Sequence, residues 1–357
     1  MNNRRVPVLM SVLGCAVMVF WGGCTKKADR ATATESTAAA ESTAQQAETA
    51  EQTASPVRVG IAKIVQHEAL DACEQGVQDA LKARGINAII DVQNANGDVN
   101  TAAQIANKFK NDKVDIAVGI ATPMAQALVN ALPATPVVFA AVTDPVAAKL
   151  VATLEHGDAY VTGLSDAIPT ADHIALFKEI AGIKTLGYIY TSSEANSISA
   201  LTIVEEACKV QGIALVTQSI NNSSELRQAA EAIVNRVDGI YLTTDNTVYS
   251  ALPALIQVFG NAKKPLFSGD VTSVFDGGSM IASGFNYYKA GVASGNIAAD
   301  IIDGKKASEI PVKFLSEPSE SDLLFDLDAA KNCGITIPQK YLDQANYIFE
   351  NGTLTSR

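Results

Sequence analysis

The chain has 357 residues, 48% of them hydrophobic, and carries 27 Lys and Arg against 38 Asp and Glu, which gives a net charge of -11. So acidic a chain argues against nucleic acid as a partner, because phosphate backbones are bound by basic surfaces. The length exceeds what one hydrophobic core usually serves, so we expect more than one domain.

Residues 1–24 have the pattern of a bacterial lipoprotein signal peptide. Arg4 and Arg5 precede an apolar run over residues 6–20, which is too short for a confident transmembrane span and is typical of a secretory signal. Small residues before Cys24 resemble a lipobox, which predicts lipidation of that cysteine, although Trp21 stands where an aliphatic residue is usual. The alternative is an ordinary secretory signal with a chance cysteine. Both versions predict that the protein leaves the cytoplasm.

Residues 25–55 are nearly all Ala, Thr, Ser, Glu, Gln and Lys, with no aromatic or branched aliphatic side chain. A segment of this composition cannot bury enough apolar surface to offset its conformational entropy. We therefore predict a disordered tether between a membrane anchor and a folded body.

The folded body, residues 56–357, alternates strand and helix patterns around a central unit. Residues 116–120 and 136–142 are short apolar runs rich in β-branched residues, and residues 123–132 have helical spacing, so the two strands should lie parallel. Similar patterns predict the other elements: strands at 57–61, 88–92, 185–190, 214–219, 239–243 and 265–268, and helices at 69–84, 100–111, 196–211, 223–235 and 248–259. After a crossing at residues 160–163 the alternation restarts, which predicts an α/β protein of two doubly wound, parallel-sheet lobes.

The common catalytic and metal-binding patterns are missing from the sequence. Residues 163–167 lack the last glycine of a nucleophile elbow, and there is no phosphate-binding glycine loop. The three histidines, His67, His156 and His173, have no ligand spacing, so we expect no metal, no cofactor and no enzyme, with a surface enzyme kept as a rival. Cys73 and Cys208 fall in helical patterns and should be buried thiols rather than disulfide partners.

Polar residues recur where the predicted strands end, which is where ligands of open parallel sheets bind. One such residue is more often a helix cap than a ligand contact, but six polar strand ends together favour a binding site. Thr122, Thr143 and helix-start N–H groups could hold a carboxylate, while Glu194 and Asp245 could pair with an ammonium, which suits a zwitterion such as an amino acid. Asp144 could instead cap the following helix. The candidate residues at these ends are Gln66, His67, Thr122, Pro123, Thr143, Asp144, Glu194, Asn196, Asp245, Asn246 and Asp270.

Several of these stretches together resemble one family. They are residues 65–71, 119–126, 138–145, 162–166, 192–197 and 244–246. The chain resembles the ABC transporter substrate-binding family that includes tryptophan and tyrosine uptake lipoproteins, over nearly all of residues 57–342. It departs from the family pattern at Glu68, where proline is usual after His67, and at Met124, where alanine is common.

The resemblance implies a type I periplasmic binding protein, whose two lobes are joined by three crossing strands and close on a ligand. The implied lobes are residues 56–163 with 284–311, and 164–283 with 312–357. Two alternatives remain for residues 286–288: they line the cleft, or they only pack at the hinge, which is the favoured alternative. The implied ligand contacts add Ser165 to the strand-end residues, and Asp166 beside it completes the candidate set.

The implied role is that of a monomeric, lipid-anchored receptor outside the cytoplasm, held to the bacterial cell membrane by its lipid alone. It would bring an aromatic amino acid to an ABC permease and its ATPase. Alternatives are a sugar, nucleoside or organic acid as ligand, or a sensory module without transport. Sugar sites stack the sugar ring on aromatic side chains, usually tryptophan. The single tryptophan, Trp21, lies in the signal peptide, which weakens the sugar alternative.

Overall fold

The computed structural model describes residues 55–315 and 320–357. The predicted signal peptide, the lipidated Cys24 and all but the last residue of the predicted tether fall on residues 1–54, outside the described part. Among the described residues, no helix combines the length and hydropathy needed to cross a bilayer.

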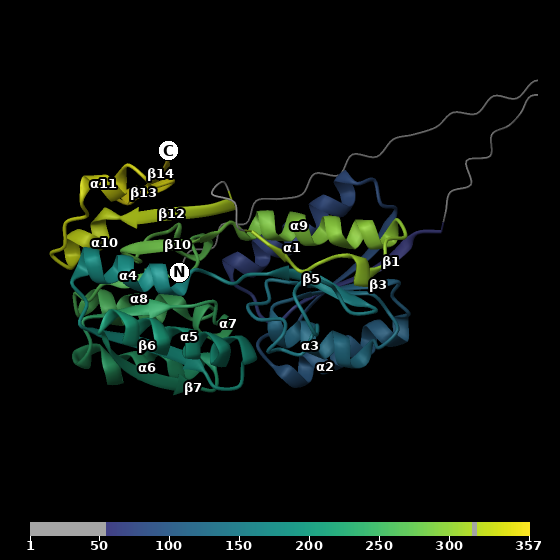
Figure 1. The fold of residues 1–357 in the computed structure, drawn as a ribbon, viewed down its shortest axis with the longest axis horizontal. Coiled ribbons are helices and arrows are strands. Elements are labelled where there is room, and N and C mark those ends of the chain that lie inside the picture. The colour runs from purple at the N-terminus through teal and green to yellow at the C-terminus, as the bar shows by residue number, and fades with distance from the viewer. Residues whose placement is uncertain (1–54, 316–319) are drawn as a thin grey trace, which may run out of the picture. The chain divides into compact units, whose positions relative to one another are not determined.

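The first lobe, called lobe 1 here, is built on a six-stranded parallel sheet in the order β11-β5-β4-β3-β1-β2. Helices α1 (Glu68–Ala83) and α9 (Tyr287–Ile302) cover one face, and α2 (Val99–Asp112) and α3 (Thr122–Ala131) cover the other (Figure 1). The strands are β1 (Val57–Lys63), β2 (Ala88–Asn94), β3 (Ile116–Ile120), β4 (Val137–Ala140), β5 (Val161–Ser165) and β11 (Lys313–Phe314).

Helices α1 and α9 lie side by side although they are far apart in sequence. Glycines permit the close approach: a Cβ at Gly76 would lie 2.2 Å from the Tyr288 carbonyl oxygen, and one at Gly291 would lie 2.0 Å from that of Cys73. Residues 287–302 therefore pack in lobe 1. Strand β11 also joins the lobe 1 sheet, whereas the sequence-based boundary assigned residues from 312 onward to the second lobe.

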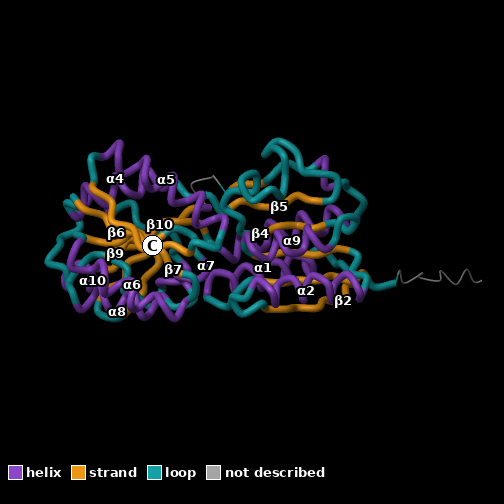
Figure 2. The backbone as a smooth tube through the Cα atoms, turned by 90° about the horizontal axis from the view of Figure 1, so that it is seen from below, coloured by secondary structure: helices purple, strands orange, loops and turns teal. Residues whose placement is uncertain are grey.

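The second lobe, lobe 2, is built on an eight-stranded sheet in the order β14-β13-β12-β10-β9-β8-β6-β7. Helices α4 and α5 pack together, as do α6 and α8, and the two pairs cover opposite faces (Figure 2). The strands are β6 (Thr185–Thr191), β7 (Ala214–Ile220), β8 (Gly239–Leu242), β9 (Leu266–Ser268), β10 (Ile281–Phe285), β12 (Ser321–Asp326), β13 (Tyr347–Glu350) and β14 (Thr353–Ser356). The helices are α4 (Thr170–Ala181), α5 (Ala195–Gln211), α6 (Leu226–Ile233), α7 (Asn246–Tyr249), α8 (Leu252–Asn261), α10 (Leu327–Asn332) and α11 (Gln339–Leu342).

The lobe 2 sheet is mixed, which corrects the expectation of two parallel sheets. Strand β12 runs antiparallel to β10, and β14 runs antiparallel to β13. The last two strands form a hairpin around Asn351 and Gly352, whose φ angles of 52° and 72° suit a tight two-residue turn. Strands joined by such a turn need no crossover helix, so they pair antiparallel.

Two helical segments of lobe 2 also differ from the sequence-based prediction. Helix α4 was not predicted, although its buried side chains Thr170, His173, Ile174 and Phe177 follow helical spacing. The helix predicted at 248–259 is two helices, α7 and α8, separated by Ser250 and Ala251. Pro253 explains the break, because it has no N–H to continue the hydrogen bonding of α7.

The chain crosses between the lobes three times: after β5, after β10, and between β11 and β12. Each lobe has its own buried apolar clusters, which include Val118 and Phe109 in lobe 1 and Ile240 and Tyr241 in lobe 2. Cys73 and Cys208 are buried as free thiols, which confirms that prediction. Since each lobe has its own core, the polar ends of the two sheets can meet across a separate interface.

Candidate functional site

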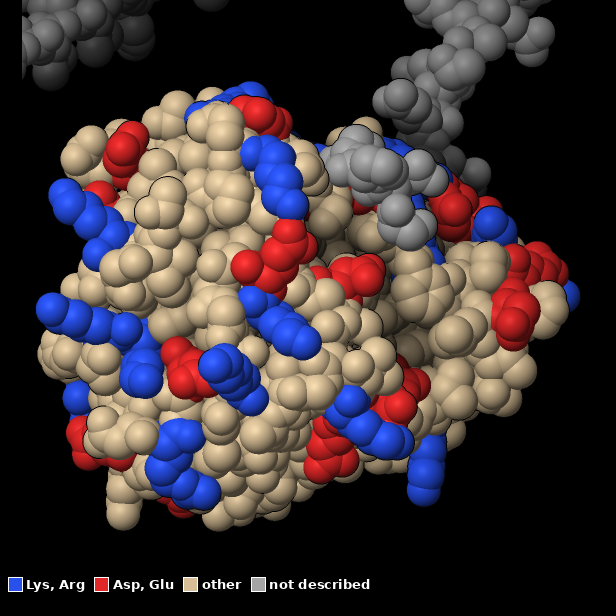
Figure 3. Space-filling view, turned by 60° about the vertical axis from the view of Figure 1, so that its left-hand side comes forward, with Lys and Arg blue, Asp and Glu red and all other residues tan. Residues whose placement is uncertain are grey.

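The carboxyl ends of the two sheets meet through direct hydrogen bonds. The hydroxyl of Thr143, after β4, lies 2.8 Å from that of Thr244, after β8. Ser199 in α5 donates to the carboxylate of Asp144 at 2.8 Å. Figure 3 shows a hollow beside the interface with acidic side chains at its edge. The lobes therefore touch where the sequence placed the candidate site.

Two cavities lie between the lobes, and Thr244 lines both. The polar cavity has a volume of about 10 Å³, and the apolar cavity has about 250 Å³. The polar cavity is lined by His67, Leu70, Asp166, Thr244, Asp245, Asn246, Tyr249, Asp270 and Tyr287. The apolar cavity is lined by Thr143, Asp144, Pro145, Leu154, Ser165, Ala167, Ile168, Thr170, Ser199, Ala200, Ile203, Thr243, Thr244 and Phe314.

Two buried carboxyl groups of the polar cavity keep unused acceptor capacity. Asp166 accepts hydrogen bonds from the hydroxyls of Thr143 (2.8 Å) and Tyr287 (2.9 Å). Asp270 accepts three, from the backbone of Thr272 and from the backbone and hydroxyl of Ser273. Burial raises the pKa of each to about 6, and the negative charge of Asp270 adds to the pKa rise at Asp166. A carboxylate has about four acceptor sites, so both can take a further donor.

The carboxyl groups of Glu194 and Asp245 are engaged within lobe 2. Asp245 accepts four hydrogen bonds at 2.6–3.0 Å, from Thr191, Ser197 and Val248, and so caps α7. Glu194 accepts five, from Asn196, Asn246 and Thr247. Burial raises the pKa of both groups. Their acceptor sites are filled, so their geometry does not favour the predicted pairing of these two groups with an ammonium.

Unsatisfied buried polar atoms concentrate on the predicted site residues. In the described part of the chain, five buried side-chain nitrogen or oxygen atoms have no hydrogen-bond partner, and four of these belong to predicted site residues. They are both ring nitrogens of His67, the hydroxyl oxygen of Thr122 and the amide oxygen of Asn196. Burial lowers the pKa of His67 to about 4, so its ring is neutral at pH 7. Since an unpaired buried polar group costs about 1–3 kcal/mol, these atoms are the strongest indication of a ligand.

Lobe 1 also presents two helix N-termini whose first N–H groups have no side-chain cap. His67 precedes α1 and Ala121 precedes α3, and neither makes a capping hydrogen bond through its side chain. Ala121 has a φ of 73°, which is unusual for a residue with a Cβ. Helix N-termini attract anions, so these ends of lobe 1 can hold a carboxylate, while Asp166, directly after β5, and Asp270, after β9 of lobe 2, can hold a cation.

The structure brings most of the predicted residues to the interface, in different surroundings. His67, Asp166, Asp245, Asn246 and Asp270 line the polar cavity. Three others, Thr143, Asp144 and Ser165, line the apolar cavity. Thr122, Pro123, Glu194 and Asn196 are buried and line neither cavity, while Gln66 is exposed. The other oxygen of Asp144 accepts from the Ala147 N–H at 2.9 Å, but residues 145–149 form a turn, so Asp144 caps a turn and not the helix that was the alternative expectation.

Four residues that line the polar cavity were not among the candidates: Leu70, Thr244, Tyr249 and Tyr287. Of the two alternatives for residues 286–288, the structure supports the cleft for Tyr287 and not the favoured packing at the hinge, because its buried hydroxyl donates to Asp166 in that cavity. Tyr288 next to it is 41% exposed and hydrogen-bonds Asp79. Tyr287 could have been found from the sequence, because it lies two residues after the end of a strand, next to Asn286. The other candidate residues were predicted from the same kind of position.

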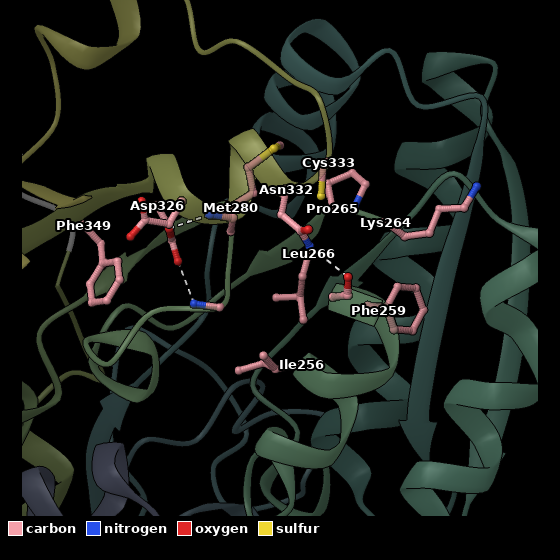
Figure 4. Close-up of a pocket in the computed structure, with 14 residues that line it drawn as sticks. Ile256, Phe259, Lys264, Pro265, Leu266, Met280, Asp326, Asn332, Cys333 and Phe349 are labelled. Atoms are coloured by element: carbon pink, nitrogen blue, oxygen red, sulfur yellow. Dashed lines mark hydrogen bonds between the residues drawn. The ribbon is translucent and has the colours of Figure 1, made fainter. Parts of the chain in front are cut away.

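A further cavity of about 230 Å³ lies at the opposite end of the lobe 2 sheet (Figure 4). Its polar side chains are engaged within the protein. Asp326 accepts from the N–H groups of Gly278 (2.6 Å) and Ala329 (2.8 Å), and Asn332 donates to the Gly260 carbonyl (2.8 Å). Apolar side chains such as Phe259 and Phe349 line the rest. This cavity offers a polar ligand little, so the inter-lobe site is the better candidate. No cluster of His, Cys, Asp and Glu suited to a metal ion occurs in residues 55–315 and 320–357.

Comparison with known proteins identifies the family of this chain. A family model described as ABC transporter substrate binding protein matches residues 58–348. The chain belongs to this family. The predicted family, the two-lobed type I fold and the role as the substrate-binding component of an ABC transporter are thereby confirmed. Proteins of this family bind a small molecule outside the cytoplasm and are not catalysts.

Three proteins illustrate the similarity. The tyrosine-binding protein of Clostridioides difficile is 35% identical over 281 residues, which cover 76% of this chain and 81% of that protein. An ABC domain from Streptococcus pneumonia in complex with L-Trp has a TM-score of 0.78 and 30% identity, over 83% of this chain and 100% of that one. A ligand-free, open substrate binding protein with adhesive properties from Clostridium difficile has a TM-score of 0.60 and 35% identity, over 79% of this chain and 96% of that one.

The two solved structures differ in how well they match this substrate-binding protein. The ligand-free, open structure is closer in sequence, yet the L-Trp complex is closer in structure. This order agrees with the hydrogen bonds that join the lobes through Thr143 and Asp144.

Proposed function

We propose that this substrate-binding protein closes on a free aromatic amino acid and delivers it to its ABC permease and ATPase. The observation that carries the proposal is the pair of unpartnered ring nitrogens of His67 in the polar cavity, joined by the unpartnered buried atoms of Thr122 and Asn196, one from each lobe, which line neither cavity. A ligand that satisfied them would stabilise the closed form over the open form. The names of two relatives, a tyrosine-binding protein and an L-Trp complex, support an aromatic ligand.

The charges on the two lobes support one orientation of the ligand. Its carboxylate would accept from the Thr122 hydroxyl and from the uncapped N–H groups of α3 and α1. Its ammonium would pair with Asp166 and Asp270, which still have acceptor capacity. This assignment replaces the pairing with Glu194 and Asp245 that was expected from the sequence.

The remaining parts of the proposal concern the molecule outside the cleft. Cys24 would carry a lipid, residues 25–55 would form the tether, and the folded body would act as a monomer held to the membrane by its lipid alone. The chain would have no enzymatic activity and no cofactor. A permease that senses the closed lobes would thereby distinguish loaded from empty receptors.

The test is calorimetric titration of residues 56–357 with each of the twenty amino acids, after unfolding and refolding to remove carried-over ligand. Binding of an aromatic amino acid in the micromolar range or tighter is expected. The protein has one tryptophan, Trp21, outside this fragment, so all indole fluorescence would come from the tryptophan ligand, and a change in that fluorescence would report its binding. Silence across all twenty would refute the amino-acid proposal, and sugars, nucleosides and organic acids would be titrated next.

A further inference from the structure

We infer that the apolar cavity receives the aromatic side chain of the ligand, and that Ile203 and Phe314 select for it. This inference rests on the proposed function and names the part of the site that sets its specificity. The polar cavity, at about 10 Å³, has room for no more than a small charged group, whereas the apolar cavity has about 250 Å³.

The apolar side chains of this cavity are incompletely covered by the protein. Leu154 and Phe314 from lobe 1 are 38% and 37% exposed, and Ile203 from lobe 2 is 47% exposed. An aromatic ring placed among them would remove their apolar surface from water, which is the main source of affinity for such a group. Both lobes contribute, so the ring would also favour closure.

The hydroxyl groups around the cavity are already used within the protein. Ser165 donates to the Thr143 carbonyl at 3.1 Å, and Ser199 donates to Asp144 at 2.8 Å. Thr243 is hydrogen-bonded to the Tyr188 hydroxyl at 2.7 Å. A sugar in this cavity would find few free partners for its own hydroxyls, whereas a hydrocarbon ring needs none. The chemistry of the lining therefore favours an aromatic side chain.

Thr244 connects the two cavities, since it lines both. Its hydroxyl is 2.8 Å from that of Thr143, at the junction. Thr143 also donates to Asp166, so it keeps a partner if Thr244 turns toward a ligand. An amino acid whose ammonium meets Asp166 would thus extend its side chain past Thr244 into the apolar cavity.

The test compares Ile203→Ser with Ile198→Ser in the full chain, purified in mild detergent and titrated by calorimetry with tryptophan, tyrosine and phenylalanine. The two isoleucines lie on the same helix and are similarly exposed, at 47% and 44%, but only Ile203 lines the cavity. We expect Ile203→Ser to weaken binding of the preferred ligand by about tenfold or more, and Ile198→Ser by less than about twofold.

A second variant, Ala200→Phe, places a ring inside the cavity from a buried position. It should weaken tryptophan more than phenylalanine, because the larger side chain loses more of its space. If the wild type binds an aromatic amino acid and Ile203→Ser binds it equally well, the inference is refuted while the proposed function stands. If that variant binds normally but no longer supports uptake, the surface serves the permease and the inference is again wrong. If the wild type binds no amino acid, the proposed function fails first.

Discussion

The cleft has two rims, which are the polar strand ends of lobe 1 and of lobe 2. Both rims carry polar residues, but the hydrogen bonds of these residues differ. On lobe 1, His67 and Thr122 have unpartnered polar atoms, and helices α1 and α3 start without side-chain caps. On lobe 2, Asp245 and Glu194 are saturated by hydrogen bonds from their own lobe, and among the predicted site residues described there the amide oxygen of Asn196 is the one buried side-chain atom without a partner. Polar residues at strand ends thus indicate where a site lies. Whether such a residue still has a free donor or acceptor indicates whether it can bind ligand or instead stabilises the protein around the site.

The largest expected effect is a loss of stability when Asp245, on the rim of lobe 2, is replaced. Asp245→Ala would leave four donors in a buried position without their acceptor, so we expect the free energy of unfolding to fall by about 3 kcal/mol or more in guanidinium denaturation. Asp98→Ala is the control, since Asp98 caps α2 from an exposed position through Thr101, and should cost about 1 kcal/mol. Unchanged stability with lost ligand binding in Asp245→Ala would show that Asp245 is a ligand group after all.

The second prediction concerns pH and Asp166. Its pKa of about 6 lies above the ordinary 3.8 because burial disfavours the charged form. The folded state therefore holds this proton more tightly, and the associated stability, present below pH 3.8, is lost as pH rises through 6. Relative to Asp166→Asn, ligand-free wild type should lose about 2 kcal/mol between pH 4 and pH 7.5.

For Asp98→Asn we expect the stability difference from wild type to change with pH in the opposite direction. Hydrogen bonds from Thr101 lower the pKa of Asp98, so its stabilising contribution is present above pH 3.8 and is lost as pH falls. Both variants are followed by denaturant unfolding across the same pH series. A stability difference between wild type and Asp166→Asn that stays constant with pH would contradict the assignment of a raised pKa.

The third prediction compares two buried threonines of lobe 1. Thr162 is 0% exposed and donates to the Ile310 carbonyl at 2.8 Å, whereas Thr122 is 1% exposed and has no partner. Thr162→Val should lower the free energy of unfolding by about 1–2 kcal/mol and leave ligand affinity unchanged. Thr122→Val should keep or raise stability while weakening ligand binding by about tenfold.

These two variants are measured by the same pair of experiments, denaturant unfolding without ligand and calorimetric titration with ligand. A Thr122→Val variant that loses stability and keeps its affinity would mean that this hydroxyl has a structural partner. That result would remove the most direct support for a carboxylate site on lobe 1.

The smallest expected effect sharpens the contact between the rims. Ser199→Ala removes one hydrogen bond across the interface, so ligand affinity should fall by less than about fivefold, or about 1 kcal/mol, and small-angle scattering should show more of an extended form. Ser192→Ala is the control, because the Ser192 hydroxyl bonds Asn221 within lobe 2. Equal behaviour of the two variants would show that the bond between Ser199 and Asp144 does not hold the lobes together.

Much of the fold was predictable because its signals are local. The strand over residues 116–120 was predicted with its observed bounds, and most elements up to residue 268 lie within a few residues of their prediction. The C-terminal strands were harder to predict from sequence, because the segment between β10 and its partner β12 packs in lobe 1, so the two paired strands are far apart along the chain. The Asn351–Gly352 pair is a hairpin signal in the sequence that was not among the predicted turns.

The α/β class, the family and the residues at strand ends could be predicted from the amino-acid order, because periodicity and turn chemistry act over a few residues. Which of those residues have their hydrogen bonds satisfied depends on contacts between distant parts of the chain. Glu194 is saturated by Asn246 and Thr247, which lie 52 and 53 positions away, and no local pattern encodes that pairing. The apolar cavity is likewise a tertiary product, since Leu154, Ile203 and Phe314 become neighbours only when the two lobes meet.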